Sequence, residues 1–480
     1  MQGLTLRKNY MTIKSTIFRP YDIRGIYPQE FNEDVAYRVS RSFCQKYRSA
    51  KKIIVAQDTR LSSPIIANAI IRGLVDAGKQ VIDIGIAPDP LFYFMIFNHK
   101  LDGGIMISAS HNPKEYNGLM LSVKKPGAKM VLDIINDDLF KLRDLVLSDR
   151  KWPASRGKIG KVIKIQPEKE YLDYVARKIK LARPLKIVID SSNGACGFLP
   201  EKIFKKLGCD VKTINGEFDG TFPNHLPDPY LEENLSDIKK AMRQYKADCG
   251  FCFDTDGDRV ALIDERDRSA SGDFCMLMLA REVLKKKKGP IIHDMRISKA
   301  VLDELAKQKV PTFFSICHHN AVIEEIIKRK AVFGGEITLH FLFPLDYYLC
   351  DDAVFAALKL AEVVSQQSSL AKYIDGLPYY PLSPEIFVDA PDDKKYQMIA
   401  DFVKYLRKNN YDFVDVDGAR INLKHGWALM RASNTGPMIK CRFEADTKEH
   451  LLEIEKEMLD LFKKTGLPIT KKLYRDLGLC

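Results

Sequence analysis

A serine and a histidine stand side by side after an apolar run, in the segment Ser110-His111-Asn112-Pro113. Small polar residues and a proline after a strand require a sharp turn, which exposes the serine. A serine in this position can act as a covalent nucleophile, because the neighbouring imidazole can take or hold a proton. The motif therefore predicts covalent catalysis at Ser110, with an ordinary polar turn as the alternative.

Three aspartates at alternate positions, Asp254, Asp256 and Asp258, follow the apolar run Cys249–Phe253. A glycine between the last two lets the backbone turn the carboxylates toward one point. Converging carboxylates repel one another unless they bind a divalent cation, and all-oxygen ligation suits Mg²⁺, which retains positions for a phosphate. An EF-hand loop would need glycine where Arg259 stands. We therefore expect a magnesium site, with an acidic surface turn as the alternative.

A polar loop near the C-terminal end has the composition of a phosphate-binding site. Arg431 supplies a guanidinium that can pair with two phosphate oxygens, and Ser433, Asn434 and Thr435 supply neutral donors. Polar loops between strands are common, so this pattern is weak when it is taken alone.

A fourth segment carries Glu336, Thr338 and His340 after an apolar run. A carboxylate, a hydroxyl and an imidazole at this spacing can hydrogen-bond to the hydroxyls of a sugar. A generic loop with a helix cap is the alternative.

Short apolar strands alternate with amphipathic helices over the first three-quarters of the chain, and these elements must position the four motifs. The predicted strands are 52–56, 80–86, 185–190, 210–214, 290–294 and 311–317, and the predicted helices are 65–77, 197–207, 299–307 and 321–329. Strand–helix–strand units predict parallel sheets covered by helices, and three such blocks predict three related α/β domains.

The order of elements changes after a proline-rich stretch at 377–384. The last block is predicted to contain helix 393–408, strands 412–416, 419–423, 427–431 and 438–444, and helix 448–464. This order predicts a small α+β domain. Further breakpoints are expected near 152–160 and 264–272.

Length and composition are those of a folded protein with several domains. The chain has 480 residues, of which 46% are hydrophobic and 29% charged, so wholesale disorder and a collagen-like fibre are excluded. Its apolar runs are far shorter than the ~18 residues of a membrane helix, and its N-terminus lacks the apolar core of a signal peptide. We therefore expect a soluble, cytoplasmic protein without a membrane partner. Met11 is an alternative to Met1 as the start.

The net charge of +12 leaves several classes of anionic partner open. The lysines are spread along the chain and form no basic stripe interleaved with aromatic residues, so nucleic acid is not expected. Acidic small molecules remain. The ten cysteines are scattered among apolar residues, and Cys249 and Cys252 lack the second ligand pair of a metal site, so we expect free buried thiols.

In this order, the four motifs resemble those of the α-D-phosphohexomutase superfamily, specifically bacterial and archaeal phosphomannomutase/phosphoglucomutase. The resemblance extends from about Ile17 to beyond Glu444. The supporting segments are Phe18–Gly25, Asp58–Ser63, Asp190–Gly194, Asp219–Pro229 and Asp351-Asp352. The resemblance implies three related mixed α/β domains plus a C-terminal α+β domain around a central cleft. We place the domains at 12–157, 158–266, 267–379 and 380–480.

The resemblance also implies a mechanism. It implies that Ser110 would carry a phosphoryl group and that Mg²⁺ would be held by that group and by Asp254, Asp256 and Asp258. A hexose monophosphate (mannose, glucose or both) would receive the phosphate, reorient as a hexose 1,6-bisphosphate and return the other phosphate. The bisphosphate would also serve as activator, and the protein would be a monomer or dimer that binds sugar phosphates. The implied catalytic residues are Ser110, His111, Arg24 and Arg259, and the implied substrate-binding residues are Tyr21, Arg296, His318, Glu336, Thr338, His340, Arg431, Ser433, Asn434 and Thr435.

The chain departs from the family pattern in the acid–base and sugar-binding segments. Met120 occupies the position of a lysine that assists proton transfer, and Arg296 replaces a second lysine. In the segment 336–340, here called the sugar loop, Leu339 stands where glycine is usual and Thr338 where serine is usual. The leucine is expected to narrow the cleft or to reshape sugar recognition. The general base is therefore open between His111 and Arg24 acting with a water.

Two alternatives follow from these departures and from the aspartate motif. A catalytically altered or inactive relative would bind sugar phosphates without turning them over. A phosphatase of the haloacid dehalogenase type would use Asp254 as its nucleophile and the pair Asp351-Asp352 as metal ligands. The second alternative leaves Ser110 and the loop at Arg431 without a purpose.

Overall fold

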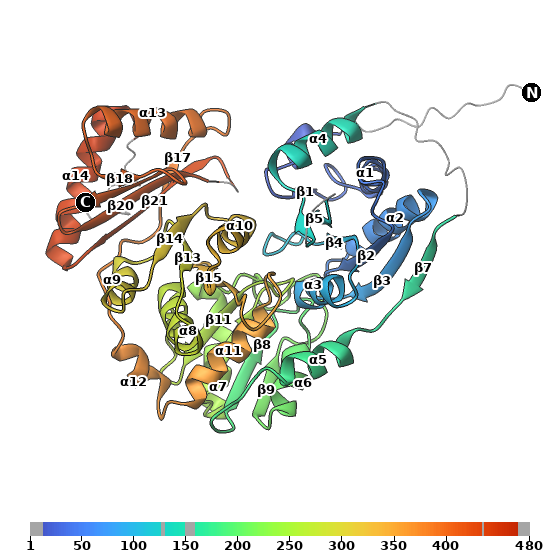
Figure 1. The fold of residues 1–480 in the computed structure, drawn as a ribbon, viewed down its shortest axis with the longest axis horizontal. Coiled ribbons are helices and arrows are strands. Elements are labelled where there is room, and N and C mark those ends of the chain that lie inside the picture. The colour runs from blue at the N-terminus through green and yellow to red at the C-terminus, as the bar shows by residue number, and fades with distance from the viewer. Residues whose placement is uncertain (1–12, 126–129, 149–158, 434–435, 469–480) are drawn as a thin grey trace, which may run out of the picture.

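The computed structural model describes residues 13–125, 130–148, 159–433 and 436–468, and within these ranges four β-sheets follow one another along the chain. In Figure 1 the four sheets and their helices form an arc, with the first domain (blue) and the fourth (red) at its two ends. Three mixed α/β domains and a C-terminal α+β domain are thus present, as predicted. Met11 and residues 152–158 of the first expected breakpoint lie outside the described residues.

The first sheet has the order β1-β5-β4-β2-β3-β7, with β6 beside β5. Its strands are β1 Ile23–Ile26, β2 Lys52–Gln57, β3 Gln80–Ile86, β4 Gly103–Ile107, β5 Tyr116–Val123, β6 Leu132–Asp133 and β7 Lys161–Lys164, and its helices are α1 Glu33–Lys46, α2 Ser63–Asp76, α3 Asp89–Asn98 and α4 Asn136–Leu147. The sheet is mixed. β2 pairs in parallel with β4 and with β3, and β3 pairs in parallel with β7, whereas β5 pairs antiparallel with β1 and with β4. Since β7 pairs with β3, this sheet extends past the boundary that we placed after residue 157.

The second sheet has the order β12-β11-β10-β8-β9, and the third has the order β14-β13-β15-β16. The second domain comprises α5 Glu168–Ala176, β8 Lys186–Asp190, α6 Leu199–Lys206, β9 Asp210–Ile214, α7 Ser236–Tyr245, β10 Cys249–Phe253, β11 Val260–Asp264 and β12 Ser269–Ala270. The third comprises α8 Gly272–Lys286, β13 Ile291–Asp294, α9 Lys299–Lys307, β14 Thr312–Ser315, α10 His319–Arg329, β15 Phe333–Glu336, β16 His340–Leu342, α11 Ala353–Ser365 and α12 Leu370–Asp375. The pairing of β12 with β11 places residues 269–270 in the second sheet, not in the third domain where our boundary put them.

The fourth sheet is antiparallel throughout, in the order β17-β21-β20-β19-β18. Its strands are β17 Ile386–Asp389, β18 Phe413–Val414, β19 Ala419–Leu423, β20 Gly426–Ala432 and β21 Met438–Ala445, and its helices are α13 Lys395–Lys408 and α14 Lys448–Thr465. Alternate residues of β21, such as Ile439, Cys441 and Phe443, belong to the domain's own core. Because side chains alternate across a strand, Lys440 and Arg442 are on the opposite face of the sheet.

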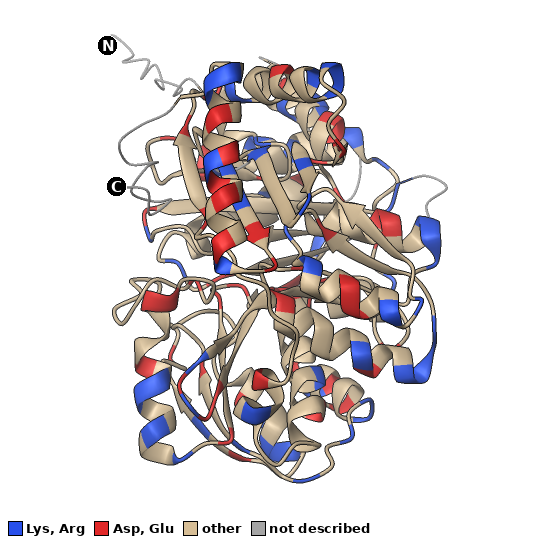
Figure 2. Cartoon of the chain, turned by 90° about the vertical axis from the view of Figure 1, so that its left-hand side faces the viewer, with Lys and Arg blue, Asp and Glu red and all other residues tan. Residues whose placement is uncertain are grey.

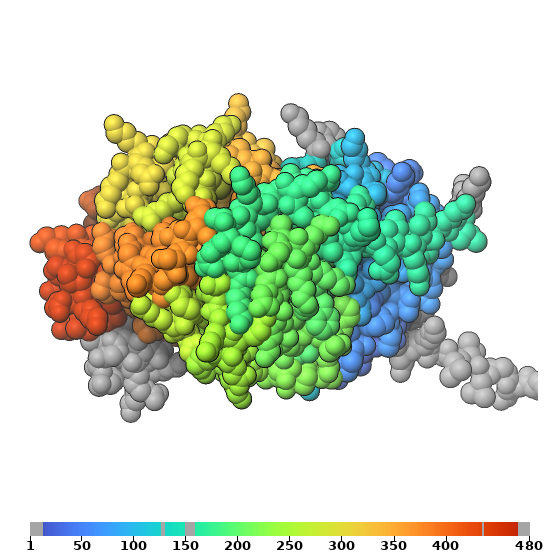
Figure 3. All heavy atoms as spheres, turned by 90° about the horizontal axis from the view of Figure 1, so that it is seen from below, coloured from blue at the N-terminus to red at the C-terminus, as the bar shows by residue number. Residues whose placement is uncertain are grey.

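The first three domains share much of their packing. One apolar core includes residues of all three, which agrees with their close contact in the space-filling view of Figure 3. The nine described cysteines are buried thiols, as predicted. In Figure 2 basic and acidic residues are interspersed along the surface helices. None of the helices in the described part of the chain is long and apolar enough to cross a membrane.

Candidate active site

Residues of all four predicted motifs line one cavity of about 370 Å³, although Asp254 and Asp256 are not among its lining residues. Ser110 follows β4, the aspartates follow β10 and Arg296 follows β13, so each lies beyond the carboxyl end of a strand in the parallel part of its sheet. The predicted site residues that line the cavity are Tyr21, Arg24, Ser110, His111, Asp258, Arg259, Arg296, His318, Glu336, Thr338, His340, Arg431 and Ser433. Asn434 and Thr435 lie outside the described residues.

Ser110 lies in a strained, tightly held turn. Its backbone has a φ of 48°, in the left-handed region, and its amide donates to Ser108 Oγ over 2.8 Å. Ser110 Oγ lies 3.1 Å from Nδ1 of His111. Burial and the neighbouring guanidinium of Arg259 hold the pKa of His111 well below its usual value, so the imidazole is neutral and its Nδ1 can accept a hydrogen bond from the serine hydroxyl.

The buried guanidinium of Arg60 holds this turn in place. It donates to the carbonyl oxygens of residues 110, 112, 113 and 116 over 2.5, 2.6, 2.7 and 3.1 Å. Asp58 anchors the guanidinium at 2.9 Å. Arg24 reaches the same turn from β1 and donates to the carbonyl oxygen of Ala109 and to Oδ1 of Asn112. Two arginines thus fix the backbone on both sides of Ser110.

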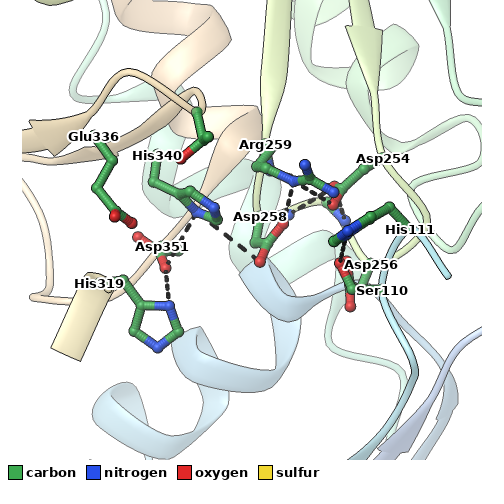
Figure 4. Close-up of polar contacts among 12 residues, drawn as sticks. Ser110, His111, Asp254, Asp256, Asp258, Arg259, His319, Glu336, His340 and Asp351 are labelled. Atoms are coloured by element: carbon green, nitrogen blue, oxygen red, sulfur yellow. Dashed lines mark hydrogen bonds and ion pairs between the residues drawn. The ribbon is translucent and has the colours of Figure 1, made fainter. Parts of the chain in front are cut away.

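The carboxylates of Asp254, Asp256 and Asp258 lie close enough together to bind one cation (Figure 4). All three are buried, and the Oδ1 atoms of Asp256 and Asp258 are inaccessible and have no hydrogen-bond partner. Burial and mutual repulsion raise the pKa of Asp254 to about 8 and that of Asp256 to about 7. Buried, unsatisfied carboxylate oxygens that repel one another form a donor set that fits a divalent cation.

Arg259 connects the aspartate loop to the cavity. Its guanidinium donates to Asp254 and to Asp228, each over 3.1 Å, and these carboxylates raise its pKa further. The side chain lines the cavity and carries a permanent positive charge there. Oδ1 of Asp254 accepts hydrogen bonds from the backbone N–H groups of residues 257, 258 and 259. Both of its oxygens therefore accept hydrogen bonds.

The sugar loop places its polar side chains on the opposite wall (Figure 4). Nη2 of Arg296 is 3.3 Å from the hydroxyl of Thr338 and 3.5 Å from Glu336. Nδ1 of His340 is 3.5 Å from Asp351 and 3.9 Å from Asp258, and these carboxylates raise its pKa to about 9 against the opposing effect of burial. This wall therefore presents cations next to buried carboxylates.

Two departures from the family pattern acquire a structural explanation. Met120 lines the cavity, so its position faces the substrate space but carries no ionisable group. Leu339 does not line this cavity, contrary to the narrowed cleft that we considered; it is buried in the apolar core and borders a separate cavity of about 180 Å³. Its φ of 76° lies in a region that favours glycine, which accounts for glycine being usual there.

Sequence reasoning missed several residues of the cavity. His319 lies between Asp133 of the first domain and Asp351 of the third, at 3.1 and 2.9 Å. The cavity is also lined by Lys440 of β21, by Phe387 of β17 and by Glu385, which directly precedes β17. The pair Asp351-Asp352 was noted, but Asp352 caps α11 and accepts from Tyr171 instead of joining the metal group. A pattern of alternate polar residues in β21 was the available signal for Lys440.

Family models for the four domains of phosphoglucomutase/phosphomannomutase match the chain in order. The alpha/beta/alpha domains I, II and III match residues 15–137, 169–268 and 271–380, and the C-terminal domain matches 385–461. Together with the fold and the cavity, these matches define the class of protein as a phosphohexomutase.

The names of similar proteins agree with this class. The chain is 30% identical to phosphomannomutase/phosphoglucomutase of Pseudomonas aeruginosa over 92% of its own length and 95% of that protein. It is 33% identical to phosphomannomutase of Vibrio cholerae, over 94% and 99% of the two chains. A crystal structure of a phosphoglucomutase/phosphomannomutase family protein from Burkholderia thailandensis superposes with a TM-score of 0.87 at 29% identity, covering 95% of this chain and all of that one. The chain belongs to the phosphoglucomutase/phosphomannomutase family and is an isomerase.

Proposed function

We propose that the protein interconverts the 1-phosphate and 6-phosphate of a hexose, mannose or glucose or both, through a phosphoserine at Ser110 and a hexose 1,6-bisphosphate. The observation that carries the proposal is that one cavity is lined by Ser110, by Asp258 of the aspartate group and by the cationic wall around Arg296 and Arg431. A mutase needs a phosphoryl carrier on one side and a grip for the phosphate that does not react on the other.

The aspartate group would hold Mg²⁺ together with the phosphoryl group on Ser110, as its donor set favours. When bound, the cation supplies charge neutralisation at the phosphoryl group during transfer. Arg259 adds a fixed positive charge beside the same group, and Nδ1 of the neutral imidazole of His111 is placed to hydrogen-bond with Ser110 Oγ. Arg24 and Arg60 keep the turn in position, so that transfer depends mainly on orientation.

The opposite wall would bind the sugar and its distal phosphate. Glu336, Thr338 and His340 present acceptors and donors for hydroxyl groups, and Arg431, held by Asp417 at 2.9 Å, presents a guanidinium. Tyr21 of the first domain and His318 of the third stack at a ring-centroid distance of 3.7 Å, and both line the cavity. Cytoplasmic sugar phosphates, with the bisphosphate as activator, are the proposed partners of a monomer or dimer.

The test is a ³¹P NMR time course with Mg²⁺ and catalytic glucose 1,6-bisphosphate, with mannose 1-phosphate and glucose 1-phosphate in separate tubes. Growth of the 6-phosphate signal is expected, and the faster tube identifies the preferred sugar. Ser110→Ala and Asp256→Ala are each expected to lower the rate by at least about 1000-fold, because they remove the phosphoryl carrier and a cation ligand. Asp401→Ala, on the exposed face of α13, is the matched control.

Other outcomes point to the alternatives. Free phosphate in place of the 6-phosphate would support the phosphatase reading, in which Asp254 and not Ser110 becomes phosphorylated. If no 6-phosphate forms from either sugar although at least one of them binds tightly, the result would support a relative that binds sugar phosphates without turnover. An unchanged rate in Asp256→Ala would contradict the metal assignment.

A further inference from the structure

Lys440 is the one lysine that lines the cavity among the described residues, and none of the motifs in the sequence pointed to it. It lies on β21, directly opposite Arg431 of β20 on one side and Phe387 of β17 on the other. Residues directly opposite one another in a sheet project from the same face. The fourth domain therefore presents a row of a guanidinium, an ammonium and an aromatic ring to the cavity.

Two like charges directly opposite one another destabilise a sheet unless something compensates them. Arg431 is 5% exposed, and burial, together with the nearby guanidinium groups of Arg296 and Arg431, lowers the pKa of Lys440 against the opposing effect of Glu385. The unfavourable pairing indicates a site shaped to receive an anion between its cations. A dianionic phosphate is the ligand that the proposed reaction brings to this wall.

The carboxylate partners of the cavity's cations distinguish Lys440 from the arginines. The arginines have carboxylate oxygens within 3.1 Å: Arg24 at 2.7, Arg259 at 3.1, Arg296 at 2.6 and Arg431 at 2.9 Å. Lys440 Nζ has Glu385 at 3.5 Å. Its side chain is 23% exposed, and the ammonium lies 5.4 Å from the ring centroid of Phe387. Lys440 is therefore the least neutralised of these five cations.

We propose that Lys440 is a second phosphate-binding cation of the fourth domain, which acts with Arg431 on the phosphate of the sugar that is not being transferred. The inference rests on the proposed function, since a sugar phosphate supplies the dianion. A lysine has a flexible stem and three rotatable donors, whereas an arginine presents a rigid fork. Lys440 can thus follow the phosphate of both isomers, and Glu385 holds the ammonium while the cavity is empty.

The experiment measures binding of inorganic phosphate and of glucose 6-phosphate to the full-length protein by isothermal titration calorimetry. Lys440→Met is expected to raise both dissociation constants about tenfold, because a charge-assisted hydrogen bond is lost, and Lys440→Arg is expected to stay within about threefold. Lys404→Met, an exposed lysine of α13 that is paired with Asp401, is the matched control. Unchanged thermal unfolding midpoints verify that the variants are folded.

Glu385 provides the decisive comparison. Removing Lys440 alone leaves the carboxylate of Glu385 to repel phosphate, so part of the effect would be indirect. We expect Glu385→Gln alone to tighten phosphate binding about twofold, and the double variant Glu385→Gln/Lys440→Met to bind nearly as weakly as Lys440→Met. Wild-type affinity in the double variant would show that Lys440 only neutralises Glu385 and would overturn the proposal, as would unchanged affinity in Lys440→Met.

The mutase assay separates this inference from the proposed function. If the wild-type protein interconverts no hexose phosphate but the binding pattern holds, the phosphate role of Lys440 stands and the proposed reaction falls. If interconversion occurs but Lys440→Met binds phosphate as tightly as the wild type, the proposed reaction stands and this inference is wrong.

Discussion

Two turns of the cavity are held by buried arginines, but those arginines come from different places. Around Ser110, Arg60 of the same domain collects the carbonyl oxygens of four nearby residues. Around Arg296 the donors come from the next domain: Arg420 donates to the carbonyl oxygens of residues 295 and 297, over 2.6 and 2.7 Å, and Arg442 to that of Arg296 over 3.0 Å.

On the proposed function, the difference separates the side of the cavity that would carry out phosphoryl transfer (the chemical side) from the side that would bind the sugar phosphate (the binding side). The arginines that hold the Ser110 turn, Arg24 and Arg60, belong to the same domain as the turn, so its geometry does not require the fourth domain to be docked. The Arg296 turn is complete only when the third and fourth domains are in contact, so its geometry depends on that contact. Changes on the first side should therefore lower kcat, and changes on the second should raise KM.

Among the variants that remove an arginine holding one of the two turns, Arg60→Met should have the largest effect. It leaves four carbonyl oxygens without their donor and the carboxylate of Asp58 buried and uncompensated, which costs roughly 3 kcal/mol or more. We expect kcat to fall by at least about 100-fold with little change in KM, in steady-state assays of hexose phosphate interconversion.

A second variant separates loss of positioning from loss of stability. Asp58→Asn/Arg60→Met removes the uncompensated charge, so it should recover thermal stability but not kcat. Arg72→Met, an exposed arginine of α2, is the control. Full recovery of kcat in the double variant would mean that Arg60 serves stability alone and that the turn does not depend on it.

The stability of the third domain should decrease on mild acidification because of His293 in β13. This imidazole is 1% exposed, donates from Nδ1 to the carbonyl oxygen of Asp294, and has no partner for Nε2. Burial lowers its pKa from 6.5 to about 4 in the folded state. Between pH 6.5 and pH 4 the histidine is therefore protonated in the unfolded chain but neutral in the folded chain, which lowers the free energy of unfolding. We expect a loss of about 2 kcal/mol between pH 7.5 and pH 5.

The measurement for His293 is a pair of urea unfolding curves at the two pH values, for the wild type and for His293→Phe. Other groups titrate in this range, so the relevant quantity is the difference in pH dependence between the two proteins. The variant should lose about 2 kcal/mol less on acidification. Equal pH dependence would show that His293 remains accessible to protons in the folded state.

Arg420→Met should affect the binding side. The buried guanidinium stacks 3.7 Å from the ring centroid of Trp427 and holds the backbone on both sides of Arg296. Without it we expect KM for the hexose 1-phosphate to rise about tenfold while kcat changes less than about threefold, because Arg296 is no longer held toward the substrate. Arg407→Met, an exposed arginine of α13, is the control. A selective fall in kcat would contradict the division between the two sides.

The sequence predicted the chemical side better than the binding side, for a physical reason. Ser110 and the three aspartates are contiguous motifs at the ends of apolar strands, so composition and strand ends locate them together. Lys440 and Arg420 act through cross-strand neighbours and contacts between domains, which depend on register and docking. β17 was not predicted, because its four residues give no periodic signal. The domain boundaries that we placed after residues 157 and 266 separate β7 and β12 from the sheets to which they belong, because the chain reaches each of these strands through a long connection or a turn.

The smallest expected effect is that of Thr338 on the binding side. Its hydroxyl receives a long hydrogen bond of 3.3 Å from Nη2 of Arg296, and the same nitrogen keeps Asp294 at 2.6 Å when the hydroxyl is removed. Thr338→Val should therefore raise KM only about twofold, and Thr338→Ser, which keeps the hydroxyl, should match the wild type. Steady-state assays with mannose and glucose 1-phosphates measure both. If Thr338→Val raised KM as much as Arg420→Met, the hydroxyl would have to contact the substrate itself, and the position of Arg296 would no longer explain binding on this wall.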